Sequence, residues 1–273
     1  MTTDFPTDLG KPAPDGASSS VSLRFDGTLA EIALDGGPLN LVDRALLRGL
    51  DASRREVTAA ADVRCLIVHG GKGRAFCAGS DIKEFERLRH DASEHKILFE
   101  DMVLRHLARM AMPTIAALDG PALGGGLELA LACDLRVCGK GVKIGLTESR
   151  LGGLAGNGSV RLTRLIGPSR AKELLYTGDT ITAECALAWG LVNRVVDEGS
   201  ALEGARALAA TIASRGPMSN RLAKELVDAA QDLALDAALS LSTGAQQEIF
   251  DSSDLHEGVA AFFAKRPPVF KGG

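Results

Sequence analysis

Residues 120–133, with the sequence GPALGGGLELALAC, decide how the chain is organised. A strand-like run, TIAAL at residues 114–118, precedes them, and from Gly125 the sequence is apolar on every side of a helix, so this helix should be buried. Glycines at its start let a ligand approach the backbone, and the free N–H groups of a first helical turn bind negative charge. The stretch therefore predicts a strand, a loop and a buried helix, whose N-terminus either binds an oxyanion or phosphate or makes a tight turn.

Glu128 is the one carboxylate of this apolar helix. A buried carboxylate is costly unless it is paired, hydrogen-bonded or protonated, and no Lys or Arg lies one turn away. Burial would raise its pKa toward the range of a general acid or base. The alternative is a structural salt bridge to a distant arginine such as Arg136, and the residue alone does not decide between the two.

The same pattern of strand, loop and helix extends outward in both directions. Residues 21–34 alternate apolar and polar side chains around Asp26-Gly27, which predicts a hairpin. Residues 65–68 (CLIV) are typical of a strand buried on both faces, and residues 93–110 of one long helix. Short strands are expected at 135–137, 142–146 and 191–196. The alternation predicts an α/β fold with mostly right-handed crossovers.

Three regions are expected. Residues 1–20 are rich in Pro, Ser, Thr, Gly and Asp and predict a flexible N-terminal tail. Residues 21–200 form the core, and residues 201–273 a helical C-terminal region with three helical segments from about Leu202. Apolar faces on such an arm pack either on a partner subunit or back on the core, and the sequence favours neither.

Composition restricts the class of partner and the compartment. Lys and Arg total 31 and Asp and Glu total 35, a net charge of −4, which argues against a nucleic-acid binder. The five cysteines are odd in number and no pair is spaced CxxC, as in a cytoplasmic protein with reduced thiols. The histidines form no metal motif. No signal peptide or bilayer-length apolar run is visible, so we expect no metal, no membrane partner and a cytoplasmic location.

A second glycine-containing loop, residues 76–84 (FCAGSDIKE), follows the buried strand and exposes backbone N–H groups. Its Ser80 and Lys83 have the SxxK spacing of penicillin-recognising enzymes, but no companion motif is present. Glu148 is a second candidate carboxylate, in the loop that follows the strand near residue 144. It is a solvated loop residue unless the fold brings it to face Glu128.

These segments together resemble the crotonase superfamily, also called the enoyl-CoA hydratase/isomerase family. The similarity runs from about residue 21 to the end of the chain. Residues 76–84 are similar to the first oxyanion-hole motif of the family, and residues 120–129 are similar to the second. Residues 38–40 (PLN) match its early Pro-x-Asn element, and Glu148 with Gly152 and Gly156 matches its third block. Residues 254–262 and 265–270 are similar to its C-terminal signature.

The resemblance implies a crotonase-like spiral of ββα turns with a helical C-terminal trimerisation region. It implies a homotrimer or dimer of trimers that binds acyl-CoA thioesters without a cofactor, coenzyme A being part of the substrate. The backbone N–H groups of Ser80 and Gly125 would form the oxyanion hole. The further substrate contacts that it implies are Ala78, Asp81, Ile82 and Lys83, Gly156 beside the water site, and Phe270 and Lys271 on the CoA nucleotide of a neighbouring subunit.

The two glutamates then indicate the reaction. Glu128 and Glu148 align with the pair that hydratases of the family use to add water across the 2,3 double bond of a trans-2-enoyl-CoA, giving a 3-hydroxyacyl-CoA. One removes a proton from water and the other protonates Cα. The alternatives are a Δ3,Δ2-enoyl-CoA isomerase, a thioesterase, dehalogenase or C–C hydrolase on the same scaffold, and, more distantly, a non-catalytic acyl-CoA or RNA binder.

The chain departs from the family pattern beside the acyl site. Ala155 replaces a frequent Pro, Asn157 stands where Ala is common, and Ser159-Val160 replaces a frequent Gly-Thr. These changes leave the acyl group open, including branched, aromatic and alicyclic groups.

Overall fold

The computed structural model describes residues 20–273, apart from the side chains of residues 86, 87 and 89. The tail predicted for residues 1–20 therefore lies almost wholly outside the described residues. Within the described part of the chain, none of the helices combines the length and the apolar character needed to cross a bilayer.

A six-stranded sheet forms the centre of the molecule, in the order β1-β2-β3-β4-β6-β9. Its strands are β1 (Val21–Asp26), β2 (Leu29–Leu34), β3 (Cys65–His69), β4 (Thr114–Leu118), β6 (Leu135–Gly139) and β9 (Arg194–Val196). β1 and β2 are antiparallel, with Asp26 opposite Leu29, and Gly27 has a φ of 57°. This confirms the predicted hairpin, because a tight turn requires positive φ. The other neighbouring strands are parallel.

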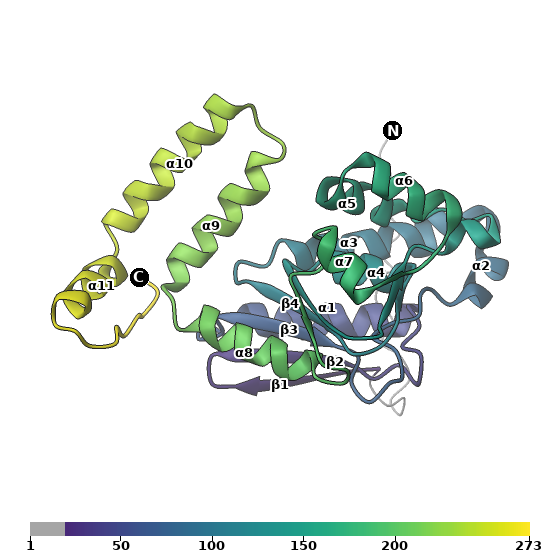
Figure 1. The fold of residues 1–273 in the computed structure, drawn as a ribbon, viewed down its shortest axis with the longest axis horizontal. Coiled ribbons are helices and arrows are strands. Elements are labelled where there is room, and N and C mark those ends of the chain that lie inside the picture. Colours follow the sequence, from purple (N-terminus) through teal and green to yellow (C-terminus); the bar gives the residue numbers. More distant parts are fainter. Residues whose placement is uncertain (1–19) are drawn as a thin grey trace, which may run out of the picture.

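The sheet is covered on both faces, which explains the uninterrupted apolar sequence of its central strands. Alternate residues of β3 point to opposite sides. Leu66 and Val68 join the larger core, which includes side chains of α1 (Arg44–Ala59), α3 (Leu98–Ala108) and α4 (Gly125–Leu131). Cys65 and Ile67 pack under α8 (Ala201–Ala213), which lies across the other face (Figure 1). The mixed α/β prediction is thus confirmed.

A smaller sheet and several short helices complete the core. The sheet contains β5 (Ala122–Leu123), β7 (Lys143–Gly145) and β8 (Ile181–Thr182). The helices are α2 (Ile82–Leu88), α5 (Gly156–Ile166), α6 (Pro168–Thr177) and α7 (Ala183–Ala188). The single helix predicted for residues 93–110 is instead a π-helical turn, Ser93–Ile97, followed by α3, which ends at Ala108.

The C-terminal region is helical, but it contains four helices rather than the predicted three. α8 is followed by α9 (Pro217–Ala230), α10 (Leu235–Phe250) and α11 (Ser253–Phe263). Pro217 occupies the first position of α9, and the Ser252 side chain caps α11, so each of these helices begins with a local start signal. α9, α10 and α11 extend away from the sheet (Figure 1), and α10 has no buried residue.

Candidate active site

The two glycine-containing loops lie against each other at the ends of β3 and β4. Cys77 donates its N–H to Pro121 O at 3.2 Å, and Leu123 donates to Cys77 O at 3.1 Å. Gly126 fits between them only because it lacks a side chain, since a Cβ there would lie 2.1 Å from Cys77 O. The two expected oxyanion motifs are therefore joined through their backbones.

Ser80 and Gly125 are brought together at this junction. A Cβ on Gly125 would lie 3.5 Å from Ser80 N and 2.8 Å from Ser80 Oγ. Gly125 opens α4, where first-turn N–H groups have no helical partner. Across residues 20–273, neither the Ser80 N–H nor the Gly125 N–H donates to another protein group. This arrangement offers two neighbouring backbone donors to a ligand oxygen.

Glu128 lies one turn further along α4 and is 7% exposed. Its Oε1 accepts a hydrogen bond of 2.6 Å from the N–H of Gly158 in α5. Burial, helped by the charge of Glu148, raises the pKa of this carboxyl to about 7, although the hydrogen bond from the Gly158 N–H opposes the shift. A carboxyl with such a pKa exchanges protons readily near neutral pH.

The alternative of a salt bridge between Glu128 and Arg136 is wrong. The guanidinium of Arg136 donates to the backbone carbonyls of Leu191, Ala130, Cys133 and Asp134. Among the described residues, no cationic group lies within 4.0 Å of the Glu128 carboxylate. The charge of Arg161 favours the ionised form of this carboxyl without forming a salt bridge with it.

Glu148 begins the 3-10 turn Glu148–Leu151, three residues after the end of β7. Its carboxyl packs against the start of α4, because a Cβ on Gly124 would lie 2.6 Å from Glu148 Oε1. Its Oε2 is buried and has no hydrogen-bond partner among the described residues. Burial raises the pKa of this carboxyl too. Glu148 thus packs against Gly124, the residue before the predicted oxyanion-hole glycine, and Glu128 lies one turn along the helix that this glycine begins.

The remaining predicted site residues divide into two groups. Ala78, Asp81, Ile82 and Lys83 lie in the first loop and the start of α2, where Asp81 Oδ1 accepts from Lys83 N at 3.0 Å. Gly156 opens α5, but the N–H that reaches Glu128 belongs to Gly158. Phe270 and Lys271 lie apart from these, in the C-terminal segment against α11.

Our sequence analysis missed a third buried carboxylate, Glu100. It lies on the buried face of α3 together with Val103, Leu104 and Leu107. Its Oε1 would be 3.4 Å from a Cβ on Gly125, so it faces the same junction. An acidic residue at an apolar position of a helical repeat is the signal that could have revealed it.

The comparisons with known proteins all point to one family. Residues 24–273 match the family described as enoyl-CoA hydratase/isomerase. A Bacillus subtilis protein named "Probable enoyl-CoA hydratase" is 36% identical over 93% of this chain and 99% of its own. An enoyl-CoA isomerase/hydratase of Mycosarcoma maydis is 39% identical over 77% of each chain. The crystal structure of an enoyl-CoA hydratase from Bacillus anthracis superposes with a TM-score of 0.89 at 36% identity, covering 93% of this chain and 100% of that one.

The fold and the family match thus define a crotonase-type acyl-CoA enzyme. The chain belongs to the enoyl-CoA hydratase/isomerase family.

Proposed function

We propose that the protein is an enoyl-CoA hydratase, which adds water to the 2,3 double bond of a trans-2-enoyl-CoA. The observation that carries this proposal is the placement of two carboxyls beside one pair of free N–H donors. Glu128 lies on the helix that Gly125 begins, and Glu148 lies against Gly124. An isomerase of this scaffold needs only a carboxylate at the Glu148 position, so the presence of Glu128 favours hydration.

In the proposed reaction, the thioester oxygen accepts hydrogen bonds from Ser80 N–H and Gly125 N–H. These fixed donors stabilise the negative charge that develops when water attacks C3, and removal of one such donor costs about 10²–10³ in rate in a comparable enzyme. The water lies between the two glutamates, one of which takes its proton while the other protonates C2. Because the two carboxyls interact, their proton belongs to the pair, and we assign neither as the sole base.

We also propose that the enzyme acts as a homotrimer or dimer of trimers. The support is the set of apolar side chains that α9, α10 and α11 leave exposed: Val227, Leu235, Leu239, Phe250, Val259, Phe262 and Phe263. Such a surface on a chain of this size indicates a protein interface. In this assembly Phe270 and Lys271 would contact the CoA nucleotide bound to a neighbouring subunit. The five unpaired thiols support a reducing compartment such as the cytoplasm.

The experiment is incubation of the purified protein with crotonyl-CoA, following the absorbance of the conjugated enoyl thioester. Loss of absorbance with 3-hydroxybutyryl-CoA as product supports the proposal. If crotonyl-CoA is inert, larger 2-enoyl thioesters test the acyl group, since Asn157 and Ser159 depart from the family pattern. A gain of absorbance from a 3-enoyl-CoA, without hydration of any 2-enoyl-CoA, would instead identify an isomerase.

A further inference from the structure

A salt bridge between Glu100 and Lys96 lies beside the junction of Ser80 and Gly125, and the proposed hydratase mechanism does not use it. Glu100 on α3 is 9% exposed, and its Oε1 faces Gly125 beside Ser80 Oγ. Its Oε2 lies 3.8 Å from Nζ of Lys96, one helical turn earlier. Glu100 therefore lies between the oxyanion hole and a buried ammonium group.

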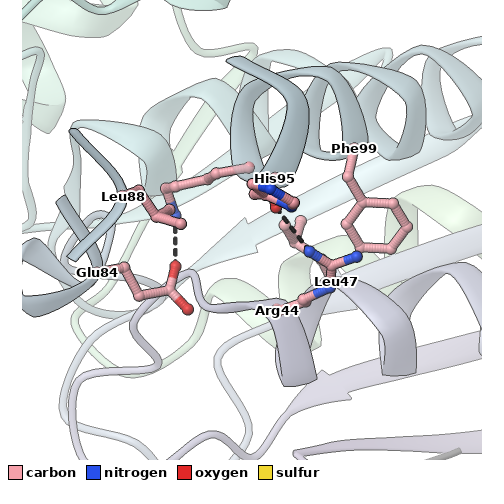
Figure 2. A pocket seen from close by; sticks show the side chains of 7 residues that line it. Arg44, Leu47, Glu84, Leu88, His95 and Phe99 are labelled. Atoms are coloured by element: carbon pink, nitrogen blue, oxygen red, sulfur yellow. Dashed lines mark hydrogen bonds and ion pairs between the residues drawn. The ribbon is translucent and has the colours of Figure 1, made fainter. Parts of the chain in front are cut away.

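Lys96 is held in place by several groups. It is 5% exposed, and its Nζ lies 3.1 Å from Oε2 of Glu84 and 3.4 Å from the carbonyl of Val42. The ring of Phe85 lies 5.5 Å from the same nitrogen. Lys96 also lines a cavity of about 290 Å³ with six residues of α1, α2, the π-helical turn and α3: Arg44, Leu47, Glu84, Leu88, His95 and Phe99 (Figure 2).

Titratable groups face Glu100 from each neighbouring element. They are Lys96 of the π-helical turn, Glu84 of α2, Glu128 of α4, Glu148 of the 3-10 turn and the thiol of Cys77. Burial, helped by the charges of Glu128 and Glu84, raises the pKa of Glu100 to about 7, although the charge of Lys96 opposes the shift. The charge of Glu100 in turn raises the pKa of Glu148. Neighbouring buried carboxyls repel one another when they are all ionised. The ionisation of each one therefore raises the pKa of the others.

We propose that Glu100, held against Lys96, is a positioning residue that keeps one proton on the Glu128–Glu148 pair. The inference rests on the proposed function, because hydration of an enoyl thioester needs one carboxyl to accept a proton and the other to donate one. Glu100 itself does not touch the transferred proton. Its negative charge makes loss of the pair's last proton harder and extends activity to higher pH.

The sign of the effect follows from the charges. Glu100→Gln removes the negative charge and keeps a side chain of similar shape. The Glu128–Glu148 pair then loses its proton at lower pH, so the alkaline limb of the profile of kcat against pH moves down by about one pH unit. Lys96→Met in the Glu100→Gln background removes a positive charge and moves the limb back up. Glu100→Asp keeps the charge and leaves the limb near that of the wild type. Glu94→Gln, an exposed acidic residue of the same π-helical turn, makes the same charge change without moving the limb.

The experiment measures kcat against pH for these variants with a 2-enoyl-CoA substrate. A downward shift in Glu100→Gln and its reversal in the double variant support the proposal. A uniform loss of kcat without a shift of the limb shows a merely structural role and overturns it. A double variant whose limb lies still lower than that of Glu100→Gln overturns it as well.

A second readout does not depend on turnover. The enolate of bound acetoacetyl-CoA absorbs in the near ultraviolet, and its apparent pKa on the protein should fall in Glu100→Gln and rise again when Lys96→Met is added. If no 2-enoyl-CoA is hydrated by the wild type but these shifts occur, the hydratase proposal fails while the electrostatic role of Glu100 stands. If hydration occurs and neither readout shifts, the role of Glu100 fails alone.

Discussion

The backbone N–H of Gly158 holds the carboxylate of Glu128 through a hydrogen bond of 2.6 Å between α5 and α4. A Cβ on Gly158 would lie 2.9 Å from the Leu146 side chain and 3.2 Å from Glu128 Cγ. The side chain of the preceding Asn157 donates to Asp101 on α3 at 2.8 Å. The first turn of α5 is thus attached to α3 and aligned with the buried carboxyl, so its position sets the geometry of the proposed water site.

Glu128→Gln and Glu148→Gln should each lower kcat for hydration by about 10²–10⁴, the usual contribution of a positioned acid or base. Binding of an unreactive acyl-CoA should persist, because the Ser80 and Gly125 donors are backbone groups. Steady-state kinetics and calorimetric titration measure the two effects. Glu184→Gln, at an exposed position on α7, serves as the control. Turnover of Glu128→Gln at the wild-type rate would refute a role of Glu128 in proton transfer.

Glu128→Gln should also stabilise the fold, and more so at higher pH. The pKa of Glu128 is about 7 in the folded protein against an ordinary value of 4.5, so the unfolded chain loses this proton first. The buried carboxyl therefore costs stability as pH rises from about 4.5 to 7, reaching about 3 kcal/mol above that range. Urea unfolding at pH 5 and pH 8 should show nearly equal midpoints at pH 5 and a higher midpoint for the variant at pH 8. The opposite trend would contradict the burial argument.

Gly124→Ala should impair catalysis by displacing Glu148. The new Cβ would lie 2.6 Å from Glu148 Oε1, and Gly124 has a φ of 51°, which disfavours any side chain. We expect kcat to fall at least about tenfold, since small displacements of reacting groups cost up to about 10² in rate. Gly190→Ala is the matched control, because Gly190 also has positive φ but no atom within 4 Å of the added Cβ. It should lose stability and keep kcat, and equal kcat losses in both would point to backbone strain alone.

Replacement of Phe262 and Phe263 by Ser should weaken the proposed assembly. Their side chains are 78% and 79% exposed in the single chain, which is unusual for two adjacent aromatic rings. Light scattering should give a particle three or six times the 28.5 kDa chain for the wild type and a smaller one for the double variant. The monomer should keep its far-ultraviolet circular dichroism. A wild-type particle of 28.5 kDa would refute the trimer and hexamer alike.

Local sequence patterns predicted the elements whose cause is local. Asp26-Gly27 specifies the β1–β2 turn, and the run Cys65–His69 specifies a strand buried on both faces. The π-helical turn before α3 and the extra break in the C-terminal helices were missed. Periodicity reports which residues face the core, and it does not separate a π-helical turn from an α-helical one or locate every interruption.

The sequence by itself determined which residues could do chemistry: two loops with free backbone donors, and a carboxylate in a helix with no polar face. Only the tertiary structure decided which of them act together. It brought Glu148, twenty-four residues further along the chain, against Gly124, kept Arg136 on backbone carbonyls, and placed Glu100 beside the proposed oxyanion hole. The reason is that burial and charge are set by neighbours that are distant along the chain, so the pKa of a glutamate is a property of its pocket and not of its motif.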